Sequence, residues 1–150
     1  MMGICNNMRV HLTQIRLIVS DFAGVAAYYR DVIGLKPQFE HPIEPPYTAF
    51  KPELGSALCL HERADLVRML GSEVLREPGS PVDTALVSLR VDDLDAYLAE
   101  VTARGGRIIA RPTTFGERTR NAYLRDPEDN LIEIQQWLKV RDGGPIPAAG

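Results

Sequence analysis

The sequence predicts an α+β fold of two βαβββ modules, whose strands form a cupped eight-stranded mixed sheet with the helices on its outer face. Three observations support this prediction. Strand-like and helix-like stretches occur in the same order in both halves of the chain. The second half aligns on the first with a shift of 72 positions, which pairs Asp21 with Asp93 and Gly34 with Gly106. Because a unit of this size cannot bury a sheet face alone, we expect the two units to join.

The first module is predicted over residues 10–63. Residues 10–20 combine β-branched and apolar residues with polar ones, as in a strand with one buried face. From Phe22 the apolar residues recur at helical spacing, with Asp21 placed to cap the helix and Gly34 placed to end it. Prolines and a glycine separate the three short strands that follow, which are LKPQFEH, YTAFKP and ALCLHE.

The second module repeats this order over residues 83–138, after a helical linker at residues 64–82. A strand at residues 84–91 leads into a helix that begins at Asp92-Asp93 and ends at Gly105-Gly106. Three strands then complete the module, and their sequences are RIIARP, NAYLRDP and LIEIQQW.

Composition limits the class of protein. The chain has 150 residues, 45% of them hydrophobic, and a net charge of −3, which suits one globular domain with flexible ends at residues 1–9 and 139–150. No basic tract suggests nucleic acid, and no apolar run reaches the roughly 18 residues of a membrane span. The start lacks the features of a secretory signal, so we expect a cytoplasmic protein. Cys5 and Cys59 make no disulfide framework, and the expected partner is a small molecule.

Strand alternation divides each strand between a face under the helices and a face that lines the cup. It places five residues under the helices, namely Ile15, Leu17, Val19, Ile132 and Ile134. On the cup side it places Gln14, Arg16, Ile18, Leu86, Ser88, Arg90, Leu131, Glu133, Gln135 and Trp137. The inside of the cup is therefore the predicted ligand pocket.

Two stretches of the chain, LIVSDFAGVAAYYRDVIGL and FGERTRNAYLRDPEDNLIEIQQW, are distinctive. They resemble the strand, aromatic-pair helix and Asp-Pro turn of the vicinal oxygen chelate superfamily of glyoxalases, bleomycin resistance proteins and extradiol dioxygenases. The resemblance covers about residues 10–138 and implies the paired-module fold. At Asp129 this family commonly has Gly, but Asp tolerates the left-handed geometry of such a turn.

The resemblance also implies where a metal ion would bind. In metal-dependent members the ligands lie on the first and last strands of each module, at positions that correspond here to Gln14, Cys59, Leu86 and Glu133. Leu86 has no donor atom, so we expect a metal-free cleft. If a divalent metal does bind, the expected ligands are Gln14 and Glu133, with either Cys59 or His61, which a strand bulge would bring into register.

Several lining residues have two interpretations. Glu133 either contacts the ligand, as the candidate catalytic residue, or pairs with Arg16 or Arg90. His61 either lines the cup or is a solvated histidine at its rim. Cys59 is more typical of a small buried residue than of a nucleophile.

The aromatic and cationic candidates are equally open. Tyr123 and Trp137 either stack on a ligand or pack in the core or a dimer interface. Arg118 either clamps an anionic ligand or pairs with Glu117 or Asp126. The candidate ligand-binding residues are therefore Gln14, Arg16, Cys59, His61, Leu86, Ser88, Arg118, Tyr123, Gln135 and Trp137.

The resemblance and these residues favour a small-molecule-binding protein of the bleomycin-resistance kind, with a metal-free cleft and no cofactor. The alternative is a divalent-metal-dependent lyase, isomerase or dioxygenase that uses Glu133 and Gln14. A third is metal-free acid-base catalysis by Glu133. The resemblance also implies a homodimer, whose cleft lies either within one chain or between two.

Overall fold

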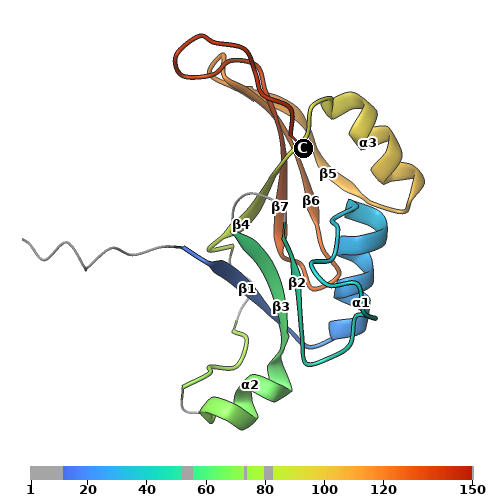
Figure 1. The fold of residues 1–150 in the computed structure, drawn as a ribbon, viewed down its shortest axis with the longest axis vertical. Helices are drawn as coiled ribbons and strands as arrows, with labels where there is room; N and C mark the ends of the chain where they lie inside the picture. The colour runs from blue at the N-terminus through green and yellow to red at the C-terminus, as the bar shows by residue number, and fades with distance from the viewer. Residues whose placement is uncertain (1–11, 52–55, 73, 80–82, 150) are drawn as a thin grey trace, which may run out of the picture.

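The first module of the computed structural model contains three strands and two consecutive helices (Figure 1). The structure describes residues 12–51, 56–72, 74–79 and 83–149. In chain order the elements of the first module are β1 (Gln14–Val19), α1 (Phe22–Ala27), the π-helix η1 (Tyr28–Ile33), β2 (Tyr47–Phe50) and β3 (Ala57–Glu62).

The second module follows a short helix, α2 (Arg63–Leu70). It consists of β4 (Leu86–Arg90), α3 (Leu94–Ala103), β5 (Ile108–Phe115), β6 (Thr119–Arg125) and β7 (Leu131–Trp137). The predicted helical linker is shorter than expected, because α2 ends at Gly71, which has a positive φ of 84°. The predicted flexible start at residues 1–9 lies outside the described residues.

The strands form two mixed sheets with corresponding orders, β1-β3-β2 and β4-β7-β6-β5. In each, the first strand runs parallel to the last strand of its module, and the other neighbours are antiparallel. This confirms the α+β class and the two equivalent modules. The eighth strand, expected at LKPQFEH, is represented by an isolated bridge between Pro37 and Phe50. Proline has no backbone N–H to donate, which limits a ladder at this edge.

The helix caps confirm the sequence repeat. The Asp21 side chain accepts from the Gly24 N–H and the Asp93 side chain accepts from the Ala96 N–H, each at 3.1 Å. Gly34, with a φ of 89°, ends η1. Asp129 has the left-handed φ of 65° that the turn was expected to need.

One hydrophobic core joins the modules, because α1 and α3 lie on the same side of the two sheets (Figure 1). Val19, Ile132 and Ile134 are fully buried there, as predicted, and Leu17 packs against them. Ile15, however, is 56% exposed, so its predicted place under the helix is wrong. The reason is that α1 begins beyond the other end of β1 and does not cover the first residues of this edge strand.

The segment after β7 returns toward β4. The Pro147 carbonyl accepts from Arg90 Nη2 and the Ala149 N–H donates to Asp92 Oδ1, both at 2.8 Å. In the part of the chain that the structure describes, no helix has the length and apolarity that a membrane crossing requires.

Candidate functional site

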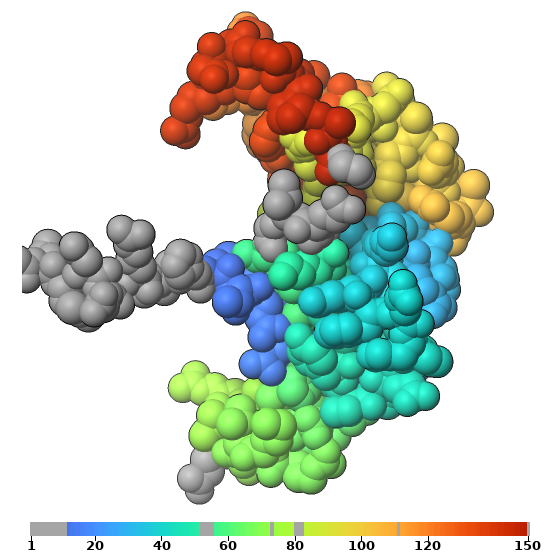
Figure 2. All heavy atoms as spheres, viewed as in Figure 1, coloured from blue at the N-terminus to red at the C-terminus, as the bar shows by residue number. Residues whose placement is uncertain are grey.

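The two sheets turn one face away from α1 and α3, and we call it the concave face. Figure 2 shows that the molecule is hollowed on this side, between the C-terminal segment and the α2 region. Polar residues gather there in two clusters, one for each module. The first-module cluster is Gln14, Arg16, Tyr47, Cys59, His61, Asp65 and Arg68, and the second-module cluster is Ser88, Arg90, Tyr123, Glu133, Gln135 and Trp137.

Gln14, Cys59 and Tyr47 form a triangle at one end of the first-module cluster. Parallel pairing of β1 with β3 sets Arg16 opposite Cys59, and β2 brings in Tyr47. The Tyr47 hydroxyl lies 2.8 Å from Gln14 Oε1 and 3.1 Å from Cys59 Sγ, and this Sγ lies 2.9 Å from Gln14 Oε1. Burial, then the hydrogen bond with Cys59, raises the pKa of Tyr47 to about 12. The hydroxyl therefore stays protonated at neutral pH.

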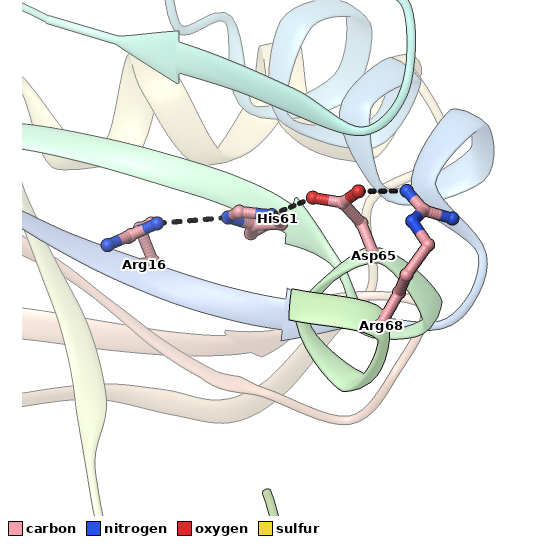
Figure 3. Close-up of polar contacts among 4 residues, drawn as sticks. All are labelled: Arg16, His61, Asp65 and Arg68. Carbon is pink, nitrogen blue, oxygen red and sulfur yellow. Dashed lines mark hydrogen bonds and ion pairs between the residues drawn. The ribbon is translucent and has the colours of Figure 1, made fainter. Parts of the chain in front are cut away.

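A chain of four polar side chains occupies the other end of this cluster (Figure 3). Arg16 Nη1 lies 3.0 Å from His61 Nδ1, and His61 Nε2 lies 2.7 Å from Asp65 Oδ2. Arg68 binds the other oxygen of Asp65. The hydrogen bond from His61, assisted by Arg68, holds the pKa of Asp65 below its ordinary value.

His61 itself is only 5% exposed, so its interpretation as a solvated rim histidine is wrong. The cause lies in the connection between elements. Strand β3 runs directly into α2, and the first turn of that helix sets Asp65 against the imidazole, four residues after His61. The β1 and β3 register is continuous through His61, without the bulge that would exchange it with Cys59.

Glu133 is the centre of the second-module cluster. The Tyr123 hydroxyl donates to Glu133 Oε2 and the Ser88 hydroxyl donates to Oε1, both at 2.8 Å, and Gln135 Nε2 lies 3.4 Å from Oε1. Burial, then the hydrogen bond to Glu133, raises the pKa of Tyr123 to about 12. Both hydroxyls thus serve as neutral donors to this carboxylate.

Of the two interpretations of Glu133, the pairing with Arg16 or Arg90 is wrong. Arg16 contacts His61, and the guanidinium of Arg90 lies 4.1 Å from the ring centroid of Trp137. Within the described ranges, no Lys, Arg or His nitrogen is within 4.0 Å of the Glu133 carboxylate. Trp137 Nε1 donates to Gln135 Oε1 at 2.8 Å, which links the indole to the carboxylate through the amide.

Two predicted site residues stay outside both clusters. Leu86 begins β4 and is 45% exposed. Arg118 is exposed in the turn between β5 and β6. Its predicted structural partners are occupied elsewhere, since Glu117 binds Lys139 at 2.8 Å and Asp126 accepts from Tyr29.

Three cluster residues, Tyr47, Asp65 and Arg68, were missed in the sequence. Alternation along YTAF would have placed Tyr47 on the concave face beside Cys59, because Phe50 faces the core. Asp65 could be found only from its four-residue spacing to His61 together with a helix that starts directly after the strand.

The donor atoms do not fit the metal ion that the fold suggests. Gln14 Oε1 already accepts from the groups of Tyr47 and Cys59, and Leu86 offers no donor. His61 is engaged by Arg16 and Asp65. Across the described ranges, no group of three His, Cys, Asp or Glu side chains is arranged to hold a metal ion.

A separate cavity of about 550 Å³ lies beside the turn between β6 and β7. Its charged lining includes Asp83 and Arg125, which pair with each other at 2.7 Å. Its lining includes Leu131, which was predicted to face the cup, but none of the candidate ligand-binding residues, so the concave face remains the candidate site.

Paired βαβββ modules with a polar concave face define the class of proteins built on the vicinal oxygen chelate fold. A sequence model of the Glyoxalase/Bleomycin resistance protein/Dioxygenase superfamily matches residues 11–134. The chain belongs to this superfamily.

Known relatives agree with this assignment. YraH of Bacillus subtilis (strain 168), an uncharacterized protein, is 30% identical over 129 residues, which cover 85% of this chain and 98% of the relative. A glyoxalase/bleomycin resistance protein/dioxygenase from Nocardioides superimposes with a TM-score of 0.69 at 20% identity, covering 93% of this chain and 91% of its own. TnmS3, an antibiotic binding protein from Streptomyces sp. CB03234, gives a TM-score of 0.62 at 22% identity, covering 87% and 98%. These structural matches support the fold.

Proposed function

We propose that this protein binds a small organic molecule on its concave face, without a metal ion. The observation that carries the proposal is the Glu133 carboxylate, which is held by the hydroxyls of Tyr123 and Ser88. Because the Glu133 carboxylate has no cationic partner among the residues that the structure describes, it favours a ligand that supplies a cation or hydrogen-bond donors.

The surroundings of Glu133 suggest the shape of that ligand. Trp137 and the guanidinium of Arg90, which stacks on it, offer a flat surface next to the carboxylate. A partly aromatic compound with an amine, amide or hydroxyl donor suits this arrangement. Superfamily members include an antibiotic binding protein, so antibiotics of this chemistry are the first compounds to test.

Binding also agrees better with the hydrogen bonds of Glu133 than acid-base catalysis does. Each oxygen of the carboxylate already accepts a hydrogen bond from a hydroxyl group, which fixes Glu133 as an oriented acceptor for the donors of a ligand. A bound metal ion would instead favour the alternative function, a metal-dependent lyase, isomerase or dioxygenase.

The chain carries its own probe, because its single tryptophan is Trp137. We expect quenching or a shift of Trp137 fluorescence when a compound binds. Glu133→Gln keeps the size of the side chain but removes its charge, and should weaken binding by about 10- to 100-fold, the loss of one charge-assisted hydrogen bond. Glu117→Gln, at an exposed carboxylate paired with Lys139, is the matched control and should bind as the wild type does.

Two results would contradict the proposal. If Glu133→Gln lowers the melting temperature but leaves affinity unchanged, the carboxylate is structural. One equivalent of a divalent metal in protein purified without chelators, lost in Glu133→Gln, would instead establish a metal-dependent protein. Elemental analysis makes this distinction.

We further propose a homodimer. The edge strands β1 and β4 carry exposed apolar side chains, Ile15 at 56% and Leu86 at 45%, which a second copy would shield from water. Sedimentation should give a dimer for the wild type and a monomer for Ile15→Lys. A cytoplasmic location is also our proposal, since the buried free thiol of Cys59 suits a reducing compartment.

A further inference from the structure

Arg16 is one of the arginines of the described residues whose charge no carboxylate neutralises. Five others have a carboxylate oxygen within 4.0 Å, namely Arg30, Arg68, Arg104, Arg120 and Arg125. Arg16 has none within the same described ranges, and its side-chain contact is the ring of His61 at 3.0 Å. Its positive charge on the concave face therefore lacks a carboxylate counterion in the described part of the chain.

In the series Arg16–His61–Asp65–Arg68, the donor and acceptor of each hydrogen bond follow from the side-chain types. A guanidinium can only donate, so His61 Nδ1 must accept and is unprotonated. The ring proton therefore lies on Nε2, from which it donates to Asp65 Oδ2 at 2.7 Å. Arg68 holds the other oxygen of Asp65. His61 is thus a neutral acceptor, and Asp65, bound to its Nε2, sets the orientation of the ring.

This neutral acceptor orients the guanidinium without cancelling its charge. Arg16 is exposed, and the bond to His61 uses one of its five N–H groups. The imidazole and the Tyr47 ring also pack in an edge-to-face arrangement, with ring centroids 5.8 Å apart and an angle of 75° between the rings. Figure 3 shows the Arg16 guanidinium at one end of this series of four side chains, beyond the imidazole. Several donors remain available in a planar array that matches two oxygens of an anion.

We infer that Arg16 binds an oxyanion, a carboxylate or a phosphoryl group of the ligand, and that His61 is its positioning residue. The inference rests on the proposed small-molecule function and deepens it. A ligand with an oxyanion at one end and hydrogen-bond donors at the other would use both polar clusters of the concave face.

The test uses benzoate and phenylphosphonate as probes, with benzamide as the neutral analogue. Binding is followed by NMR through the Nε–Hε resonance of Arg16 and the imidazole nitrogens of His61. We expect saturable shifts with both anions and none with benzamide. Tighter binding of phenylphosphonate identifies a phosphoryl ligand, and tighter binding of benzoate identifies a carboxylate. Equal shifts with benzamide would overturn the inference.

Variants separate the binding residue from the positioning residue. Arg16→Gln should weaken anion binding at least tenfold, whereas Arg30→Gln, at an exposed arginine paired with Asp31, should not change it. His61→Leu removes the acceptor and should also weaken binding. His61→Gln retains both an acceptor for Arg16 and a donor for Asp65, so it should restore affinity to within threefold of the wild type. Unchanged affinity in Arg16→Gln would refute the assignment.

The His61 nitrogens provide a readout that a purely structural role would not produce. The wild type should show an unprotonated Nδ1 and a protonated Nε2, and the Nδ1 resonance should move when an anion takes donors from Arg16. A protonated Nδ1 in the free protein would contradict the inference. If compounds bind at Trp137 but the anions do not shift the Arg16 resonance, this inference fails and the proposed function stands. If anions bind at Arg16 but no compound perturbs Trp137, the Glu133-centred function fails instead.

Discussion

Asp126 shows how one buried carboxylate joins the two modules. It is 3% exposed and accepts from the backbone N–H groups of Glu128 and Asn130, at 2.8 and 3.0 Å, and from Asn130 Nδ2 at 2.8 Å. These bonds close the turn between β6 and β7. The Tyr29 hydroxyl of η1 donates to its Oδ2 at 2.9 Å. A charge that is removed from water in this way needs such donors, so the bond from the other module contributes to stability.

Tyr29→Phe should lower the free energy of unfolding by about 2 kcal/mol, because a buried charged acceptor loses one hydrogen bond. Urea unfolding measures the change. The adjacent Tyr28→Phe is a matched control, since the buried Tyr28 hydroxyl has no partner among the described residues. Its removal should leave stability unchanged or raise it slightly. Equal losses in the two variants would show that ring packing matters more than the bond.

At the residue scale, the sequence predicts the sheet face on which a side chain lies better than it predicts the residue to which that side chain binds. Alternation placed Glu133 and Arg16 on the concave face, and the contacts agree. The alternative in which an arginine pairs with Glu133 was wrong, because a partner depends on strand register and rotamer, which a single sequence does not specify. The burial of His61 depends on where α2 starts, because only a helix that begins at Arg63 places Asp65 in its first turn against the imidazole.

The turn between β6 and β7 also supports the start of α1. The Glu128 carboxylate accepts from the backbone N–H groups of Ser20 and Asp21 at 2.9 Å. These donors immediately precede the first helical residue, Phe22. The DPEDN stretch that carries the family resemblance therefore has a structural role, which is to dock the second module on the first.

Glu128→Ala should cost about 1 kcal/mol of unfolding free energy, as the loss of a helix cap does. Thermal and urea unfolding of the variant measure the loss. Glu117→Ala is the control, because its ion pair with Lys139 is exposed and should contribute little. A Glu128 variant as stable as this control would show that the docking contributes nothing.

At the element scale, the caps were predictable and the lengths were not. Asp21 and Asp93 cap their helices as the repeat requires, since capping depends on local residues. The predicted linker helix over residues 64–82 extended apolar spacing past Gly71, where the backbone turns left-handed. The expected strand LKPQFEH is reduced to one bridge, because pairing at a sheet edge depends on donors that Pro37 lacks.

The whole molecule combines a shared core with separate polar clusters. Residues of both modules fill one hydrophobic cluster, whereas among the described residues no hydrogen bond joins the first-module cluster to the second-module cluster. The repeat in the sequence predicts this core, because equivalent apolar positions need a common partner. The chemistry of the clusters depends on residues that differ between equivalent positions of the modules, such as Cys59 in the first and Glu133 in the second. The repeat does not predict these differences.

All five tyrosines of the chain have a raised pKa in the fold, and burial is the largest cause for each. For Tyr47, Tyr97 and Tyr123 the pKa rises to about 12 from an ordinary value of 10.0. Between these values the unfolded chain loses protons that the folded chain keeps. The stabilising contribution is therefore complete below pH 10 and is lost as the pH rises toward 12.

The denaturant midpoint should consequently stay level up to pH 10 and fall steeply above it. A direct measurement is the tyrosinate absorbance at pH 10, which should be small for the native protein and close to half of its maximum in concentrated denaturant. Tyr123→Phe removes one tyrosine at the concave face, and the other tyrosines of the native protein should still ionise well above pH 10. A native protein whose tyrosines ionise at pH 10 as the unfolded chain does would show that the hydroxyls are open to solvent, contrary to the packing of the core and both clusters.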